Sequence, residues 1–198
     1  MKPILQKSFM GLQECEILCQ YTKLRRATNR MVKRKQSTGT VWESHGTALT
    51  DSIGLTYLHR AQDIFKKDLS LSSSMIKVWN KGCAMGWHLN KWEFEYVVCI
   101  QISDHAWPIG FAHGQDNPVV EGLQYDANII TPIQGDAVFF NGAQTYHGRR
   151  RLQDDHCITL CLYYVTMHGH LDSKAGRKKY GDEYKTRIEL HGEIRYDA

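Results

Sequence analysis

The feature that most constrains the fold is a series of short apolar runs that begins near Ser74. Each run has five to ten residues, is rich in β-branched and aromatic side chains, and is bounded by Gly, Pro, Asn or Asp. Such runs are typical of β-strands joined by tight turns. Six are present: MIKVW (75–79), FEYVVCIQIS (94–103), PIGFA (108–112), NIITPI (128–133), DAVFF (136–140) and CITLCLYYV (157–165). Because no helical pattern separates them, they predict an antiparallel sandwich or barrel.

The part of the chain before these runs has a different pattern, which predicts helices. Residues 8–32 place Leu, Met and Cys at weakly helical spacing. Residues 52–67 carry apolar side chains close to the helical period, behind N-cap candidates at positions 50–52. We therefore expect a mainly β protein with flanking helices, of the α+β class. Its expected organisation is a single domain over 1–198, with a helical part over 1–70, a β core over 74–165 and a charged C-terminal extension over 166–198.

Length and composition limit the classes of protein that fit. The 198 residues suffice for one domain with a sizeable core. No stretch approaches the roughly 20 apolar residues of a membrane span, and the N-terminus is too polar for a signal peptide, so we expect a cytoplasmic protein without membrane contact. The six cysteines are expected to be reduced core thiols. The spacings of Cys15 with Cys19 and of Cys157 with Cys161 leave metal binding as the alternative.

The formal net charge of +4 is unevenly distributed along the chain. Seven basic residues and no acidic residue lie in the segment 23–35: Lys23, Arg25, Arg26, Arg30, Lys33, Arg34 and Lys35. A run of this kind either contacts the phosphates of a nucleic acid or forms a solvated surface. Both interpretations stay open at the level of the sequence.

Two of the ten histidines lie at the boundary of a strand pattern. His88 follows the Gly-rich stretch 81–87, and His147 follows the strand run 136–140 and its turn. An iron site of the 2-His-1-carboxylate kind uses two side chains two residues apart that face inward, and a third from a distant strand. His88, residue 90 and His147 supply this arrangement, except that residue 90 is Asn rather than a carboxylate.

Residues 74–165 resemble the double-stranded β-helix (jelly-roll, cupin-like) core of the Fe(II)/2-oxoglutarate-dependent dioxygenases, particularly the small forms of phages and marine microbes. The resemblance rests on the order of several short motifs. These are SMIKVWNKG (74–82), His88-Leu-Asn90-Lys91, Glu95, YVVCIQIS (96–103), Trp107-Pro-Ile109, Gly135-Asp-Ala137 and His147-Gly-Arg149. It implies an enzyme that uses Fe(II), 2-oxoglutarate and O2 to oxidise, by hydroxylation, a C–H bond of a prime substrate that the sequence does not identify. Succinate and CO2 would be the other products.

The resemblance assigns the metal to His88, Asn90 and His147, and Asn90 departs from the family's carboxylate. An amide oxygen brings a dipole but no charge, so iron affinity should be lower. Three outcomes stay open: the Asn oxygen as a weak ligand, a two-His site completed by water or an anion, and a relative that has lost the metal. Glu95 could supply a carboxylate, but strand parity places positions 88 and 95 on opposite faces.

The resemblance also concerns the co-substrate. Family members usually hold the distal carboxylate of 2-oxoglutarate with Arg or Lys about ten residues beyond the distal His, where this chain has Cys157. Arg149 shares face parity with His147 and is the first candidate for that carboxylate, because a guanidinium fork suits it. Lys77, on the preceding strand, is the alternative.

Two other functions remain compatible with the sequence. The first is a catalytically inactive β-helix module that engages nucleic acid through residues 23–35. The second is a cupin-type protein that uses the same histidines for zinc or manganese.

Overall fold

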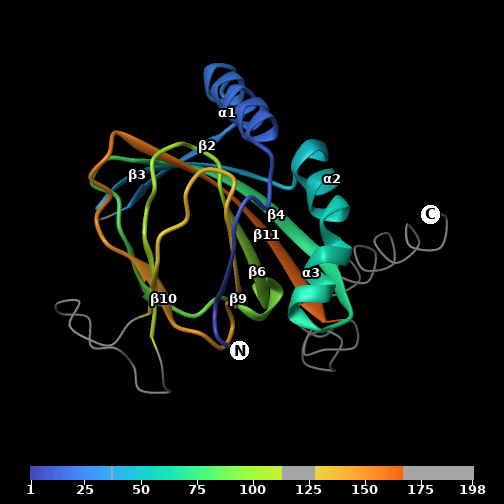
Figure 1. Cartoon of the computed structure of the whole chain (residues 1–198). Coiled ribbons are helices and arrows are strands. Elements are labelled where there is room, and N and C mark those ends of the chain that lie inside the picture. The colour runs from blue at the N-terminus through green and yellow to red at the C-terminus, as the bar shows by residue number, and fades with distance from the viewer. Residues whose placement is uncertain (37, 113–127, 167–198) are drawn as a thin grey trace, which may run out of the picture.

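The computed structural model describes residues 1–36, 38–112 and 128–166 (Figure 1). The expected extension over 166–198 lies outside this range, except for Thr166. The helices are α1 (Leu12–Ala27), α2 (Ala48–Thr56), α3 (Leu58–Phe65) and the 3-10 helix η1 (Trp92–Phe94). The strands are β1 (Ile4–Gln6), β2 (Val32–Gln36), β3 (Gly39–His45), β4 (Leu69–Asn80), β5 (Met85–His88), β6 (Tyr96–Gln101), β7 (Ile109–Phe111), β8 (Asn128–Ile130), β9 (Ala137–Asn141), β10 (His147–Arg149) and β11 (His156–Thr166).

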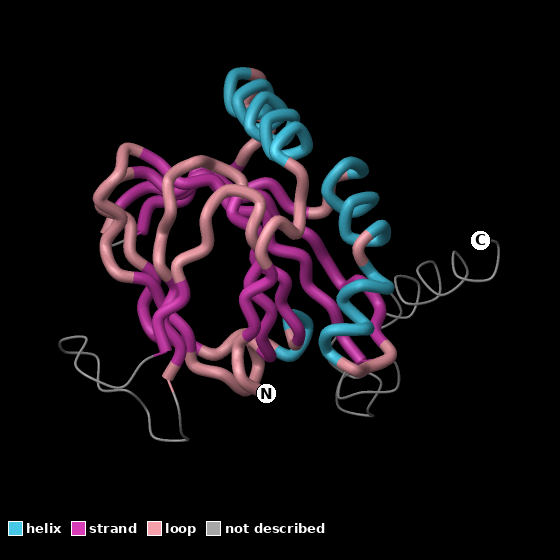
Figure 2. The backbone as a smooth tube through the Cα atoms, viewed as in Figure 1, coloured by secondary structure: helices cyan, strands magenta, loops and turns pink. Residues whose placement is uncertain are grey.

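The strands form two antiparallel sheets that face each other. The large sheet has seven strands in the order β1-β9-β6-β11-β4-β3-β2, and the small sheet has four in the order β5-β10-β7-β8. Figure 2 shows the strands gathered in two layers. One buried cluster contains Cys99 and Phe140 of the large sheet together with Phe111 of the small sheet, so apolar side chains fill the space between the layers. This confirms the predicted double-stranded β-helix, a mainly β fold with flanking helices.

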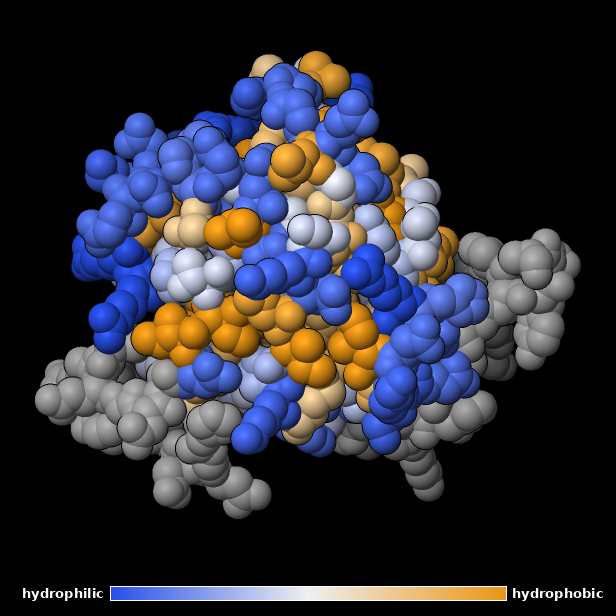
Figure 3. Space-filling view, viewed as in Figure 1, coloured by the Kyte–Doolittle hydropathy of each residue, from blue (hydrophilic) through white to orange (hydrophobic). Residues whose placement is uncertain are grey.

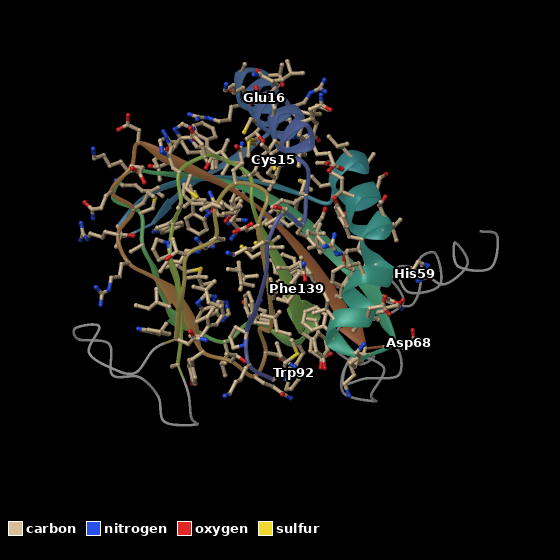
Figure 4. The ribbon with its side chains drawn as sticks, viewed as in Figure 1. Cys15, Glu16, His59, Asp68, Trp92 and Phe139 are labelled. Atoms are coloured by element: carbon tan, nitrogen blue, oxygen red, sulfur yellow. The ribbon has the colours of Figure 1, made fainter. Side chains whose placement is uncertain are left out.

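The large sheet is buried on both of its faces. Its outer face packs against α1, α2 and α3 through Leu160, Leu162 and Tyr164, while Cys161 and Tyr163 of the same strand face the small sheet. Figure 1 shows the three helices on the side of β4 and β11 away from β10. Phe139 contributes to the outer face as well, because its ring lies 5.5 Å from that of Phe65 (Figure 4).

All six strands predicted from apolar runs are present, as β4, β6, β7, β8, β9 and β11. Five strands were not predicted: β1, β2, β3, β5 and β10. The expectation of a helical part over 1–70 was incomplete, because three of these strands belong to that segment and join the large sheet. The basic residues of β2 hid its strand character, since its side chains from Val32 to Lys35 are exposed.

The helix expected over 52–67 is two helices, α2 and α3, which meet at Tyr57. Its start was placed too late, because the N-cap is Thr47, whose side chain accepts the backbone N–H of Thr50 at 3.2 Å. The second helix ends when Lys66 adopts a left-handed conformation with φ 54°. The helix expected over 8–32 is shorter and occupies Leu12–Ala27.

Two further expectations concern cysteines and membranes. All six cysteines are free, and five of them are buried, among them Cys15 of α1 (Figure 4). Within the described ranges, none of the helices has the length and apolar character required to cross a bilayer. The visible surface carries hydrophilic and hydrophobic residues side by side, with a hydrophobic band on the face where β1 lies (Figure 3).

Candidate metal centre

The small sheet brings His88 and His147 together, although 59 residues separate them in the sequence. Strands β5 and β10 are antiparallel neighbours, and their register places His147 directly opposite His88. The two imidazole rings have centroids 4.3 Å apart and planes inclined by 48°. Two side chains that sequence reasoning selected for one site therefore share one face of one sheet.

Each imidazole is held by a hydrogen bond to its own strand. The Nδ1 of His88 lies 2.9 Å from the carbonyl oxygen of Gly86, and the Nδ1 of His147 lies 2.9 Å from that of Thr145. A carbonyl oxygen only accepts, so both Nδ1 atoms donate. In a neutral ring this leaves the lone pair on Nε2, which is the arrangement in which histidine binds a metal ion.

His147 is kept neutral by its surroundings. The side chain is 3 % exposed and its ring packs 4.7 Å from that of Phe140. Burial lowers the pKa of His147 to about 3, and the positive charges of His88 and Arg149 act in the same direction. At neutral pH the ring therefore carries no proton on Nε2 that a metal would have to displace.

Asn90 lies just beyond the end of β5 and is fixed by contacts of its own. Its backbone N–H donates to the carbonyl oxygen of Gly142 at 2.8 Å, and its Nδ2 donates to that of Phe94 at 3.3 Å. Because Nδ2 is engaged in this way, Oδ1 is the atom of the amide that remains to accept or to ligate. An aspartate here would instead place a second oxygen against the Phe94 carbonyl.

Among the described residues, no carboxylate joins the two imidazoles. Glu95 accepts hydrogen bonds from the backbone N–H and the hydroxyl of Thr166, at 3.3 Å and 3.1 Å, so its carboxylate is engaged at the end of β11. In the part of the chain that the structure describes, no three side chains of His, Cys, Asp or Glu gather into a metal-binding group. The structure therefore brings the two imidazoles together, while the hydrogen bond that the Asn90 amide donates goes to Phe94.

Arg149 lies two residues beyond His147 on β10 and is 6 % exposed. Its Nη1 donates to the carbonyl oxygen of Trp107, its Nη2 donates to Sγ of Cys99 at 3.4 Å, and its guanidinium stands 4.8 Å from the centre of the Trp107 ring. Within the described residues it has no carboxylate partner. A buried cation that no carboxylate pairs with is costly, so this position favours an anionic ligand.

Lys77, the alternative cation, is already paired. Its Nζ lies 3.3 Å from Oε1 of Glu43, whose other oxygen is 2.6 Å from Nε of Arg34 and 3.5 Å from Nε2 of His45. Burial alone would raise the pKa of Glu43, but Lys77, Arg34 and His45 outweigh it and hold that pKa below its ordinary value. Of the two cations that sequence reasoning selected, Arg149 is therefore the one without a carboxylate.

Sequence reasoning missed the groups that surround Arg149. Cys99 and the carbonyl of Trp107 contact its guanidinium, and Cys161 lies 3.7 Å from Cys99. Their strands were predicted, but the register that aligns Cys99 of β6 with Cys161 of β11 depends on strand pairing across 62 residues. The alternation of residues along β6 and β11 could have shown which side chains of each strand share a face. It could not have shown which residue of β6 lies opposite which residue of β11.

Comparison with known proteins gives a match at the level of structure. No protein-family model matches the chain, and no curated protein matches it either. The α-ketoglutarate-dependent non-heme epimerase SnoN from nogalamycin biosynthesis superposes with a TM-score of 0.66 at 10% identity, over 83% of this chain and 78% of that one. HygX from Streptomyces hygroscopicus, solved with nickel and 2-oxoglutarate, gives 0.65 at 12% identity, over 84% and 83%. A Pseudomonas putida prolyl-4-hydroxylase gives 0.61 at 10% identity, over 83% and 92%.

The chain has the fold of the Fe(II)/2-oxoglutarate oxygenases. The similarity covers more than three quarters of this chain and of each of these three structures. At sequence identities near 10%, the structural similarity shows the fold alone. The chemistry follows from the residues of this chain.

Proposed function

We propose that this protein is an Fe(II)- and 2-oxoglutarate-dependent oxygenase that hydroxylates a C–H bond of a substrate still to be identified. The observation that carries the proposal is the pair of imidazoles of His88 and His147, 4.3 Å apart and both with Nδ1 tied to a carbonyl. The buried guanidinium of Arg149, which has no carboxylate partner among the described residues, lies two residues from one of them. Solved structures of the same architecture bind nickel or iron together with 2-oxoglutarate.

The metal would be held by Nε2 of His88 and Nε2 of His147, with Oδ1 of Asn90 or a solvent molecule as the third donor. All of these donors are neutral, so the protein would not offset the double positive charge of the ion, and binding should be weaker than in a site with a carboxylate. Bound Fe(II) and 2-oxoglutarate supply the oxidising chemistry, in which O2 oxidises the co-substrate to succinate and CO2 and also oxidises the prime substrate.

The co-substrate would be oriented by Arg149. Its guanidinium offers charge-assisted hydrogen bonds to the distal carboxylate, and Trp107 holds the guanidinium in place through its carbonyl and its ring. The rings of Phe111 and Phe140 beside His147 provide an apolar wall that excludes water from the site.

The assay that tests the proposal measures succinate formed from 2-oxoglutarate under Fe(II) and air. We expect wild type to form succinate and His147→Ala to form none above background. His105→Ala is the matched control, because the His105 ring pairs with His156, 5.6 Å away, instead of with the site. Equal rates in all three proteins would overturn the oxygenase proposal and favour an inactive module. Zinc or manganese in the purified protein would favour the cupin-type alternative.

We also propose that the basic segment 23–35 contacts nucleic acid. The segment comprises the end of α1 and the edge strand β2, and of its seven basic residues only Arg34 has a carboxylate partner among the described residues. Arg26 and Lys33 stand 5.1 Å and 5.5 Å from the ring centre of Trp42. Unpaired cations beside an aromatic ring suit a phosphate backbone with accessible bases.

Fluorescence polarisation of a labelled single-stranded oligonucleotide tests this second proposal. We expect the double variant Lys33→Glu/Lys35→Glu to weaken binding and to reduce the slope of log affinity against log salt by about 1 to 2. Lys2→Glu/Lys7→Glu, which reverses two exposed charges outside the segment, should bind like wild type. Equal loss in both double variants would show that net charge alone is responsible.

A further inference from the structure

Two thiols meet on the inner face of the large sheet. Cys99 of β6 and Cys161 of β11 are directly opposite each other in an antiparallel pair, and their Sγ atoms are 3.7 Å apart. Opposite residues of antiparallel strands have Cα atoms about 4.5 to 5.5 Å apart, which lies within the range that a disulfide bridges. The backbone is therefore already in a geometry that a bond between the two sulfurs requires.

The two thiols differ because of the charges around them. Cys161 donates its S–H to Cys99, and Nη2 of Arg149 donates to Cys99 at 3.4 Å. The hydrogen bond from Cys161, with the nearby positive charges of Arg149 and Lys77, lowers the pKa of Cys99 to about 6, whereas the pKa of Cys161 is raised. These shifts favour the thiolate form of Cys99 and the protonated thiol form of Cys161 beside it.

We propose that Cys99 and Cys161 form an oxidisable dithiol next to Arg149, which hydrogen peroxide converts to a disulfide. Cys161 keeps some exposed surface whereas Cys99 is only 5 % exposed, so a peroxide would have to reach the pair from the side of Cys161. A nucleophilic thiolate with a resolving thiol at contact distance is the arrangement that favours a reversible disulfide over further oxidation of the first sulfur.

Oxidation of the dithiol takes place in two steps. The Cys99 thiolate attacks one oxygen of hydrogen peroxide, the O–O bond breaks, and the departing hydroxide takes up a proton to leave as water, so that Cys99 becomes a sulfenic acid. The Cys161 sulfur then attacks the Cys99 sulfur, the S–O bond breaks, and the hydroxyl leaves with the Cys161 proton as a second water. Two thiols lose two electrons in total, and the peroxide gains them.

Three other cysteines, Cys15, Cys19 and Cys157, differ from Cys99 in the surroundings of their thiols. Cys15 and Cys19 follow each other by one turn of α1 and are buried, and burial raises the pKa of Cys15 to about 11. Cys157 is buried, and its pKa is raised as well. No cation among the described residues donates a hydrogen bond to any of these three thiols, so they should stay reduced under conditions that oxidise Cys99.

A consequence for the co-substrate rests on the proposed function. In the reduced protein the Cys99 thiolate partly neutralises Arg149, and a dicarboxylate has to compete with it. A disulfide carries no charge, so oxidation would free the guanidinium. We expect the affinity of the metal-free protein for succinate to rise by about fivefold on oxidation, at the low end of coupling between neighbouring sites.

The first experiment counts thiols after native protein is treated with hydrogen peroxide, denatured and alkylated. We expect wild type to lose two of its six thiols and to yield a peptide pair linked through Cys99 and Cys161. Cys161→Ser should instead give a dimedone adduct at Cys99, and Cys15→Ser should form the same linked pair as wild type. Six remaining thiols in wild type, or a linkage between other cysteines, would overturn the inference.

Equilibrium dialysis of succinate against reduced and oxidised metal-free protein separates this inference from the proposed function. Arg149→Met should bind succinate weakly in both redox states, and Arg149→Lys serves if that variant fails to fold. A disulfide together with unchanged succinate binding in wild type and variant would refute the role of Arg149, while the dithiol would stand. Succinate formation in the oxygenase assay without any disulfide would refute the dithiol alone.

Discussion

Asn90 is the residue that most distinguishes this site from a 2-His-1-carboxylate centre. Its side chain already has a structural role, because Nδ2 donates to the Phe94 carbonyl and the backbone N–H ties the loop to Gly142. A carboxylate cannot donate that hydrogen bond and would face an oxygen instead. A metal ion would be bound best by a negative charge at position 90, whereas the loop needs a hydrogen-bond donor there. One side chain cannot meet both requirements.

Asn90→Asp should consequently change two properties in opposite directions. We expect Fe(II) to bind at least about tenfold more tightly, a gain of about 1.4 kcal/mol or more from one added negative charge. The metal-free protein should lose about 1 kcal/mol of stability with the Phe94 hydrogen bond. An anaerobic Fe(II) titration and a urea melt measure the two effects. Asn80→Asp, at the end of β4, is the control, and an equal gain in affinity there would refute a role of position 90.

Glu43 is the residue whose charge should determine stability in acid. Its pKa in the folded protein lies below the ordinary value of about 4.5, so its ionised form stabilises the fold above that pH, and this contribution is lost as the pH falls through the folded pKa. Glu43→Gln should cost about 2 kcal/mol at pH 7, because Lys77 and Arg34 lose their buried partner. The difference from wild type should shrink below pH 4.5.

Urea unfolding at several pH values measures this effect. The matched control is Glu16→Gln on α1, where the carboxylate is exposed and, within the described ranges, accepts a hydrogen bond from Gln20 alone (Figure 4). That substitution should change stability by a few tenths of a kcal/mol at every pH. A gap between Glu43→Gln and wild type that stays constant from pH 7 to pH 3 would contradict the assigned role of the charge.

Sequence reasoning succeeded for residues whose neighbours along the chain are informative. His88 and His147 could be selected because each stands at the boundary of a strand pattern, and the structure brings their rings together. The pairing of Lys77 with Glu43 was not foreseen, since it depends on the register of β3 with β4. The contact of Asn90 with Phe94 was missed because a loop has no periodicity from which it could be inferred.

Within the small sheet, strand β10 lies between β5 and β7 at close range. A Cβ added at Gly148 would lie 3.0 Å from the carbonyl oxygen of Met85 and 3.3 Å from the backbone nitrogen of Trp87. Both of these atoms are backbone and cannot rotate away. The absence of a side chain at Gly148 therefore sets the distance between β5 and β10, and with it the distance between the two histidines.

Gly148→Ala should separate these strands by a few tenths of an ångström. We expect a stability loss of about 1 to 3 kcal/mol, as for an overpacked core, and a several-fold loss of metal affinity because the two Nε2 atoms move apart. Gly86→Ala is the matched control on β5, since a Cβ there meets nothing within 4 Å. Isothermal titration with Co(II) compares the two variants. Equal metal affinities in both would mean that the sheet spacing does not control the site.

Short elements explain most of the missed secondary structure. Strands β1 and β10 have three residues each, too few for an alternating pattern to stand out. The break between α2 and α3 at Tyr57 occurs without Pro or Gly at that position, so no residue type there predicts it. The runs MIKVW of β4 and CITLCLYYV of β11 were identified because burial on both faces favours apolar residues at neighbouring positions.

At the scale of the whole molecule, the predicted site spans both sheets. His88, His147 and Arg149 belong to the small sheet, while Cys99, which Arg149 contacts, belongs to the large sheet. The fold class could be predicted from the succession of strands, since two layers are the usual way to bury so many apolar runs. The order of strands within each sheet could not, because it depends on pairings between segments far apart in the sequence.

A ligand that joins the two sheets should stabilise the protein against unfolding. At a ligand concentration of 100 times Kd the gain is about 2.7 kcal/mol, and for a chain of this size each kcal/mol raises Tm by about 2 to 4 °C. We therefore expect saturating 2-oxoglutarate with Co(II) to raise the Tm of wild type by about 5 to 10 °C. Differential scanning calorimetry measures the shift.

Two variants separate the increase in Tm due to Co(II) from the increase due to 2-oxoglutarate. His88→Ala should lose the increase due to Co(II) but keep a smaller increase due to the dicarboxylate, because Arg149 remains. Arg149→Met should show the opposite pattern, because both imidazoles remain to bind the metal. If each variant lost both increases, metal and dicarboxylate would have to bind as one unit, and the separate roles assigned to β5 and to the Arg149 side chain would be wrong. Retention of both increases in both variants would place the ligands elsewhere in the molecule.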